Sequence, residues 1–345
     1  MEIQFTNIIQ FIFVFQMIFG LCLIWKNKRY RGLSYLLIFS GFTMAFNLAE
    51  ELAGTRAFIL VTPIFLLGKG PLFYFFVYQL IYPDKKITKA LFIHLCPMLC
   101  ALAFTQWPQS VIAFGTISQF IYVCLSIKLI SLYHKVSFSM RSDADSLQLF
   151  WLIKVLITVL LVGALDLIRL NLQPNITLEF NLAGQLFENT AILLLLSYLI
   201  FKAVNHHLLF NGMSAFEQLD IKNNEKEALE NDGLSKIIFL NLEDVIKNKS
   251  LHHKSRLSLN DLAEETGLNT REISRAINLS AHCNFCDYIN KLRVEDLKDK
   301  LLIKTDDKIS ILDMAFAVGF NSKSSFNLIF KRETGKTPTQ FIKSI

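Results

Sequence analysis

The sequence predicts an all-α protein in two parts, a polytopic helical membrane domain of about seven spans followed by a cytoplasmic helical domain. The chain of 345 residues is 52% hydrophobic and 19% charged, whereas soluble domains carry about 25% charged residues. Its mean hydropathy is +0.40. The apolar excess lies almost entirely before about residue 204, and the later residues have an ordinary soluble composition with an internal repeat. We therefore expect a membrane-spanning sensor domain over 1–204, a juxtamembrane linker over 205–234 and a soluble domain over 235–345.

The first part contains stretches long and apolar enough to cross a bilayer, which takes about 20 residues. The seven expected spans are 5–25, 32–50, 58–81, 90–107, 111–133, 149–170 and 182–203. The first is no cleavable signal peptide, because its basic cluster KNKRYR (26–31) follows the apolar run. That cluster and the basic loops 83–89 and 134–148 would face the cytoplasm by the positive-inside rule. The prediction is a bacterial inner-membrane protein with its N-terminus outside and its C-terminal domain in the cytoplasm.

Several ionisable residues lie within or at the ends of these spans, where charge is costly and marks a functional site by default. The candidate sensor residues are Glu50, Glu51, Lys69, Asp166, Arg169 and Glu188. Two interpretations stay open. In the first, purely structural pairs form between Lys69 and Glu50 or Glu51, and between Asp166 and Arg169. In the second, the residues line an outward-facing pocket for a small ligand.

The soluble part contains two copies of one pattern. SLNDLAEETGL (258–268) aligns with SILDMAFAVGF (310–320) at an offset of 52 residues. Each copy has a Ser cap with Asp three places on, then Ala, and a closing Gly. A second helix follows, with Ile273 and Ile277, or Phe326 and Phe330, facing inward. Helix, Gly turn and a second helix with a polar outer face make a helix-turn-helix unit, and two copies in register make the pattern specific. We expect the units at about 258–279 and 310–332.

The second helix of each unit would lie in a DNA major groove with its first residues at base edges. Candidate base contacts are Thr270, Arg271, Glu272 and Arg275 in the first unit, and Ser322, Lys323, Ser324 and Asn327 in the second. Lys331, Arg332 and Lys336 are candidate phosphate contacts. The alternative is that these residues form only a solvated face.

The stretch AHCNFCDYINKLRVEDLKDKLL (281–302) raises a different question, because His282, Cys283 and Cys286 have a spacing seen in zinc and redox sites. A zinc site needs four ligands, so His252 and His253 would have to reach over. The apolar residues recur every three or four positions, which favours a helix over about 284–302 that joins the two units, with the cysteines as small buried residues.

The tail resembles the DNA-binding domain of AraC/XylS-type bacterial transcription regulators. The resemblance covers about 235–345 and rests on LNDLAEETGLNTREISRAI, on FCDYINKLRVEDLKDKLL and above all on ILDMAFAVGFNSKSSFNLIFKRETGKTPTQF. It implies seven helices, two helix-turn-helix units and a rigid joining helix. The tail departs from the family at Leu328, where Arg is common, and at LSAHC (279–283), which lacks the usual Gly. GKGPLFYFFVYQLIYP (68–83) is similar to a stretch of family variants in which several spans replace the sugar-binding barrel.

Together these features predict a membrane-embedded one-component transcription regulator that senses a signal at the membrane and binds DNA sequence-specifically. Its expected partners are promoter DNA, the lipid bilayer and an unknown small ligand or membrane signal; the amphipathic stretch 235–249 is compatible with a homodimer. No cofactor, bound metal or enzymatic activity is expected. The alternative is a membrane receptor or transporter whose tail is a protein-interaction module.

Overall fold

The computed structural model describes residues 5–26, 30–54, 60–83, 85, 90–143, 148–205, 232–302 and 310–344. These residues form fourteen α-helices and no β-strand, which confirms the all-α class. Most of the predicted linker, 206–231, lies outside the described residues. The chain divides into two compact units: unit 1 comprises Met1–Leu132 and Leu149–Met213, and unit 2 comprises Tyr133–Gln148 and Ser214–Ile345.

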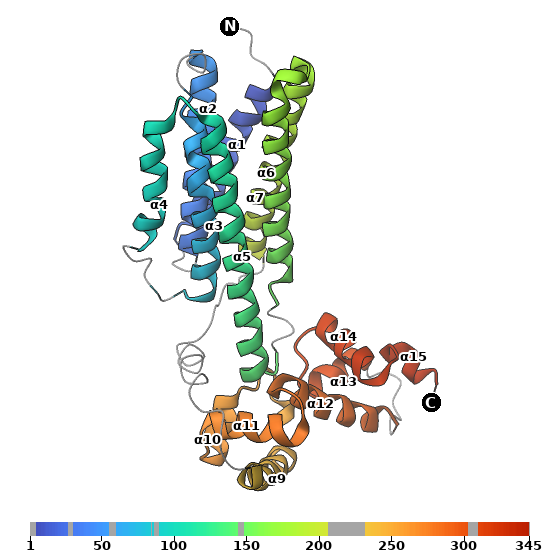
Figure 1. Cartoon of the computed structure of the whole chain (residues 1–345). Coiled ribbons are helices and arrows are strands. Elements are labelled where there is room, and N and C mark those ends of the chain that lie inside the picture. The colour runs from blue at the N-terminus through green and yellow to red at the C-terminus, as the bar shows by residue number, and fades with distance from the viewer. Residues whose placement is uncertain are drawn as a thin grey trace. The chain divides into compact units, whose positions relative to one another are not determined.

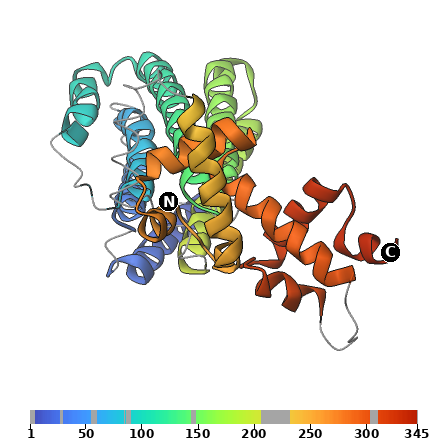
Figure 2. The ribbon, with the colours of Figure 1, turned by 90° about the horizontal axis from the view of Figure 1, so that it is seen from below.

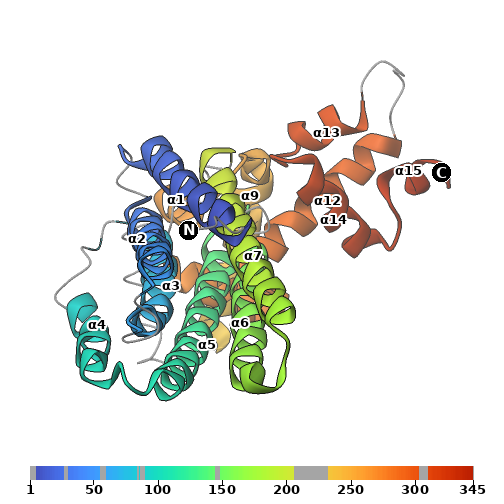
Figure 3. The ribbon, with the colours of Figure 1, turned by 90° about the horizontal axis from the view of Figure 1, so that it is seen from above.

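Unit 1 is a bundle of long helices that run alongside one another (Figure 1). Its helices are α1 (Phe5–Ile24), α2 (Arg31–Ala53), α3 (Leu66–Ile81), α4 (Ala90–Cys100), α5 (Pro108–Met140), α6 (Phe150–Leu172) and α7 (Leu178–Asn205), and α5 continues into unit 2 from Tyr133 on. Short 3-10 turns η3 (Thr62–Phe65), η4 (Ala101–Phe104) and η6 (Gln173–Asn175) adjoin α3, α4 and α6. Seen down the bundle, α4 lies at its outer edge (Figure 3).

Six helical segments of unit 1 are long and apolar enough to cross a membrane: Phe5–Ile24, Arg31–Ala53, Thr62–Ile81, Pro108–Met140, Phe150–Leu172 and Leu178–Asn205. They carry large apolar side chains on their outside, among them Phe15 (69% exposed), Phe114 (66%) and Leu161 (59%). The remaining predicted span, 90–107, forms the short α4 with Pro97 inside it, followed by η4. Length and composition therefore support six spans in the described residues, one fewer than expected.

Helix α3 continues through Pro71 of the GKGP stretch (68–71). Gly70 permits a close helix crossing, because a Cβ there would lie 3.0 Å from the Cα of Gln119 in α5. This crossing brings α3, with Lys69, against α5.

Unit 2 contains α9 (Asp232–Asn248), η8 (Leu251–His253), α10 (Leu259–Thr266), α11 (Thr270–Ala281), α12 (Phe285–Leu302), α13 (Ile311–Ala317), α14 (Lys323–Thr334) and α15 (Pro338–Ile342). Within the described residues 232–302 and 310–344 these are seven α-helices, the number that the resemblance implied. Helices α13, α14 and α15 gather at one end of α12, and α9, α10 and α11 at the other (Figure 2). A core of Val294, Leu297 and Leu301 from α12 packs against Ala315, Phe326 and Phe330.

Candidate nucleic-acid interface and buried polar cluster

The first helix-turn-helix unit is α10 and α11, and each helix begins with a capping box. Ser258 accepts a hydrogen bond from the Asp261 amide at 3.3 Å, and the Asp261 carboxylate accepts one from the Ser258 amide at 2.7 Å. Asn269 and Glu272 repeat this arrangement for α11, at 2.9 and 3.2 Å. Between the helices Gly267 has φ +70°, the left-handed conformation that glycine adopts without strain.

The second unit, α13 and α14, uses the same local signals. Ser310 accepts from the Asp313 amide at 3.1 Å and Ser322 from the Ser325 amide at 3.1 Å. Gly319 closes the turn with φ +102°. Helix α14 begins at Lys323, one residue later than the repeat offset from Thr270 would place it. The predicted caps and both turn glycines are thus present.

The inward faces also agree with the prediction, because Ile273, Ile277 and Phe330 are fully buried and Phe326 is 2% exposed. In the second unit Ala315 is fully buried where the two helices meet. The polar residues between these apolar positions are therefore left to the outside of each second helix.

The candidate base contacts fall into two groups. Arg275, Lys323, Ser324 and Asn327 are exposed and Arg271 is half-buried. Residues four apart share a helix face, so Arg271 with Arg275, and Lys323 with Asn327, form equivalent stripes on α11 and α14. The other candidates have structural surroundings: Thr270 is only 7% exposed, while Glu272 and Ser322 cap their helices.

The candidate phosphate contacts lie at the end of α14 and beyond. Lys331 is exposed. Arg332 donates to Asp287 at 2.7 Å and to its neighbour Glu333 at 3.0 Å, and Lys336 donates to Ser344 at 3.1 Å. Leu328, where the resemblance led us to expect Arg, is 59% exposed.

The cysteine pair of the joining helix does not gather ligands among the described residues. His282 ends α11 with φ +52°. Cys286 is buried, donates to the Ser142 carbonyl at 3.6 Å and accepts from Asn290 at 3.3 Å. This supports the interpretation of Cys286 as a small buried residue.

A different trio joins the two histidines considered above with Asp296, which the sequence did not indicate. The ligand atoms of His252, His253 and Asp296 all lie within 4.8 Å of one another. One Asp296 oxygen, Oδ2, meets His253, His252 at 3.5 Å and Lys300 at 3.1 Å. Burial lowers the pKa of His252, which favours its neutral form. Because Lys300 also contacts this oxygen, Asp296 links the two histidines of η8 to α12 through polar contacts.

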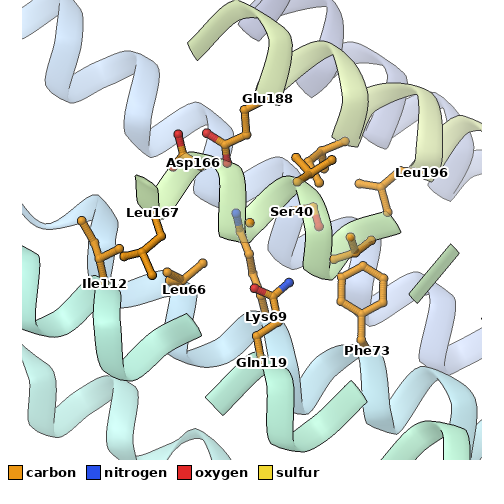
Figure 4. A pocket seen from close by; sticks show the side chains of 14 residues that line it. Ser40, Leu66, Lys69, Phe73, Ile112, Gln119, Asp166, Leu167, Glu188 and Leu196 are labelled. Atoms are coloured by element: carbon orange, nitrogen blue, oxygen red, sulfur yellow. The ribbon is translucent and has the colours of Figure 1, made fainter. Parts of the chain in front are cut away.

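In unit 1, Lys69, Asp166 and Glu188 line one cavity together with Gln119 and Ser40, and the Lys69 ammonium points toward the two carboxyl groups (Figure 4). The cavity volume is about 40 Å³, enough for a few waters or a ligand of that size. Gln119 is 2% exposed and its buried side-chain oxygen has no hydrogen-bond partner.

The other candidate sensor residues have identified partners. Arg169 donates to Asp166 at 2.5 and 2.8 Å, so the predicted Asp166–Arg169 pair forms. Glu50 accepts from the Val61 amide at 2.7 Å at the start of η3, and Glu51 accepts from Gln10 at 3.1 Å. Glu50, Glu51 and Arg169 thus have identified hydrogen-bond partners, Lys69 and Glu188 line the cavity, and Asp166 does both.

Comparison with known proteins agrees with the geometry of unit 2. Residues 262–344 match the family described as a helix-turn-helix domain. The chain is 26% identical over 102 residues to the probable transcription factor PqrA of Proteus vulgaris, covering 29% of this chain and 81% of that protein. It is 29% identical over 117 residues to the putative HTH-type transcriptional regulator YkgA of Escherichia coli, covering 34% and 46%.

A third relative is the Msm operon regulatory protein of Streptococcus mutans, 29% identical over 91 residues, 26% of this chain and 32% of that protein. The chain therefore spans under half the length of two of these three relatives. The similarity lies in an AraC-type helix-turn-helix region and supports a function in DNA-binding transcription regulation.

Proposed function

We propose that this chain is a membrane-embedded, one-component transcription regulator. Unit 2 would bind promoter DNA sequence-specifically, and a signal sensed by unit 1 would control that binding. The observation that carries the proposal is the joint presence, in one chain, of two capped helix-turn-helix units with matching outer stripes and of six long apolar helices.

The DNA contacts follow from exposure and chemistry. Arg271 and Arg275 on α11 would reach guanine, and Lys323 and Asn327 on α14 would reach guanine and adenine respectively. Lys331 is the best phosphate contact, because it is exposed and near the end of α14. Arg332 would first have to exchange its contacts with Asp287 and Glu333.

The signal site would be the cavity at Lys69, Asp166 and Glu188. The unpartnered Gln119 oxygen and the mixed charges suit a small polar ligand, and the cavity volume excludes a large one. A binding assay on the full-length chain tests this. Lys69→Met, Asp166→Asn and Glu188→Gln should each weaken binding, whereas Glu51→Gln, outside the cavity lining, should not. Unchanged affinity in all three cavity variants would remove the site.

The proposed topology retains seven crossings, with the N-terminus outside and unit 2 in the cytoplasm. It requires α4 and η4 to cross as a short span. Their 15 residues reach only about 22–25 Å, against about 30 Å of hydrocarbon, so the bilayer would have to thin locally. The basic loops support this arrangement by the positive-inside rule.

The test of the whole proposal is genome-wide crosslinking of the full-length, membrane-inserted chain to DNA in its native cell. We expect a few sharp peaks upstream of genes, which disappear when Arg271 and Lys323 are both replaced by Ala. Lys236→Ala, an exposed lysine on α9, is the matched control and should keep the peaks. Crosslinking that is identical in the double variant would contradict the base-contact assignment.

A second function, a membrane receptor or transporter with a protein-interaction tail, is favoured by one observation, the 59% exposed Leu328 on α14. Under that function no peaks would appear, and the tail would capture a protein partner through Leu328. A homodimer through α9, which exposes Ile237 and Leu240, is compatible with either function.

A further inference from the structure

The segment between α5 and α6 is part of the compact unit that contains the two helix-turn-helix units. The end of α5 from Tyr133 on and the residues that follow it up to Gln148 belong to unit 2. The Ser142 amide donates to the Leu257 carbonyl at 2.9 Å, and Arg141 forms an antiparallel bridge with Ser258, the cap of α10. Ser142 and Asp143 are 2% and 7% exposed. Arg141 and Ser142 are therefore paired with residues of unit 2 through their backbone, and Ser142 and Asp143 are well covered.

The deepest contact of this segment is with Arg293 in the middle of α12. Arg293 is 2% exposed. Its Nε donates to the His252 carbonyl at 2.8 Å; its two terminal nitrogens donate to the Lys254 carbonyl at 2.9 Å and to Asn290 at 3.1 Å. The remaining two contacts are with Ser142: its hydroxyl at 3.1 Å and its carbonyl at 3.5 Å.

Arg has five N–H groups, and these five contacts use them all. Burial lowers the pKa of Arg293 to about 10, so the guanidinium keeps its charge at neutral pH. A buried charged donor that loses its partner is strongly destabilising. Removal of Ser142 would leave two of the five donors without a protein acceptor, and α12 would have to adjust.

Arg293 also touches the turn of the second unit. A Cβ added at Gly319 would lie 2.8 Å from the Arg293 Nε and 2.5 Å from the His252 carbonyl. The guanidinium carbon lies 5.8 Å from the centre of the Phe320 ring. One side chain therefore contacts η8, which leads into α10, the Gly319 turn between α13 and α14, and the segment from between α5 and α6.

We propose that Ser142, seated on Arg293, is the contact through which α5 and α6 control DNA binding. With Ser142 docked, Arg293 holds both helix-turn-helix units in their DNA-binding arrangement, and withdrawal of the segment loosens it. This inference rests on the proposed function, since it assumes that unit 2 binds DNA. The same two helices supply Gln119 and Asp166 to the cavity of unit 1. A ligand in the cavity could therefore displace Ser142 through the backbone of α5 and α6.

The first arm of the test measures docking without DNA. Cys286 is fully buried and its thiol faces the Ser142 carbonyl, so maleimide labelling of Cys286, followed by peptide mass spectrometry, reports withdrawal of the segment. The full-length chain in lipid nanodiscs is used. Ser142→Pro removes the amide that bonds Leu257 and should speed labelling about tenfold or more. Ser142→Ala removes only the hydroxyl and should speed it less.

The matched control is Ser139→Ala, a half-buried serine whose hydroxyl donates to the Lys135 carbonyl of its own helix at 3.0 Å. It should leave labelling unchanged. Asp166→Asn, in the cavity, should change the labelling rate if the route runs from the cavity to the segment. Labelling of Ser142→Pro at the unaltered rate would overturn the docking, and an unaltered rate in Asp166→Asn would overturn the route.

The second arm measures affinity for a DNA fragment recovered by crosslinking. Ser142→Pro should weaken binding about tenfold and Ser142→Ala less, with Ser139→Ala unchanged. Faster labelling of Cys286 with unaltered DNA affinity would contradict the proposal that Ser142 controls DNA binding, but would leave the proposed regulator function intact. If the unaltered chain binds no DNA at all, the proposed function fails, and the regulation of DNA binding through Ser142 fails with it. The labelling experiment still decides whether the segment docks.

Discussion

The two turn glycines occupy equivalent positions of the repeat, yet replacing each with alanine should have very different costs. Gly267 has φ +70° with no atom within 4 Å of an added Cβ, whereas at Gly319, φ +102°, the Cβ would lie 2.5 Å from the His252 carbonyl oxygen. An L-residue in the left-handed region costs about 1–2 kcal/mol. Crowding against a fixed backbone adds roughly 1–3 kcal/mol. We therefore expect Gly267→Ala to cost about 1–2 kcal/mol and Gly319→Ala roughly 2–5 kcal/mol.

Hydrogen exchange of the full-length chain in nanodiscs, read from peptides of α12 and α13, measures this difference. Each 1.4 kcal/mol or so is a tenfold change in an equilibrium, so Gly267→Ala should reduce protection about tenfold and Gly319→Ala about tenfold further. Gly335 has φ +74° and, like Gly267, no atom within 4 Å of an added Cβ. Gly335→Ala is therefore the control and should behave like Gly267→Ala. Equal losses at Gly267 and Gly319 would refute the placement of η8 against the second turn.

Three further outcomes are expected. Arg271→Ala and Lys323→Ala should each lose about 1–3 kcal/mol of base discrimination, whereas Lys331→Ala should weaken binding to every DNA sequence alike and reduce its salt dependence. Fluorescence anisotropy with matched and scrambled DNA sites measures both effects. If all three variants weakened binding to every sequence equally, the base contacts would be contradicted. Burial alone would raise the pKa of Asp261, but hydrogen bonds from Lys254 and Ser258 hold it below its ordinary value. The resulting stabilisation is complete above the unfolded pKa of about 3.9 and is lost as pH falls through the lower folded value, so Asp261→Asn should flatten the acid dependence of α10 exchange, and an unchanged acid limb would count against it. In a chain with its native cysteines replaced, Lys85→Cys and Gln109→Cys should label from opposite sides of the membrane if α4 crosses, and from one side if it does not.

The helix-turn-helix units could be predicted because their signals are local. A Ser or Asn cap bonds an amide two or three residues away, and a turn glycine is required by the chain's own φ angle. Ser258, Ser310, Gly267 and Gly319 therefore took their predicted roles without reference to the rest of the molecule. The one-residue shift at the start of α14 arose because Ser322, and not Asn321, became the cap.

The apolar stretches could be predicted more securely than the helices within them. Hydropathy counts apolar residues whether or not one helix contains them all, so 90–107 has the composition of a span. The helix there ends at Cys100 and continues only as a 3-10 turn. In the sensor set, the Asp166–Arg169 pair could be predicted from their separation of three residues, whereas the convergence of Lys69 and Glu188 depends on how three helices pack.

The role of Arg293 could not be predicted, because none of its partners is marked in the sequence. It stands among alternating charges in KLRVEDLK, where an exposed arginine is the ordinary expectation. Four of its five acceptors are oxygens of η8, the segment after it, or Ser142, which lies 151 positions earlier in the chain. Carbonyl acceptors leave no signature in residue type, and neither does the small hydroxyl of Ser142.

Thermodynamic reciprocity gives the coupling through Ser142 a further consequence. If withdrawal of the segment lowers affinity for DNA by some factor, DNA must lower the withdrawn population by the same factor. Operator DNA should therefore slow maleimide labelling of Cys286 by about the factor that Ser142→Pro costs in affinity. Non-operator DNA of equal length should slow it less, and in Ser142→Pro, where the segment is already withdrawn, operator DNA should leave the labelling rate unchanged. Slowing of equal size in Ser142→Pro would mean that DNA merely covers Cys286, and the coupling would have to run through another contact.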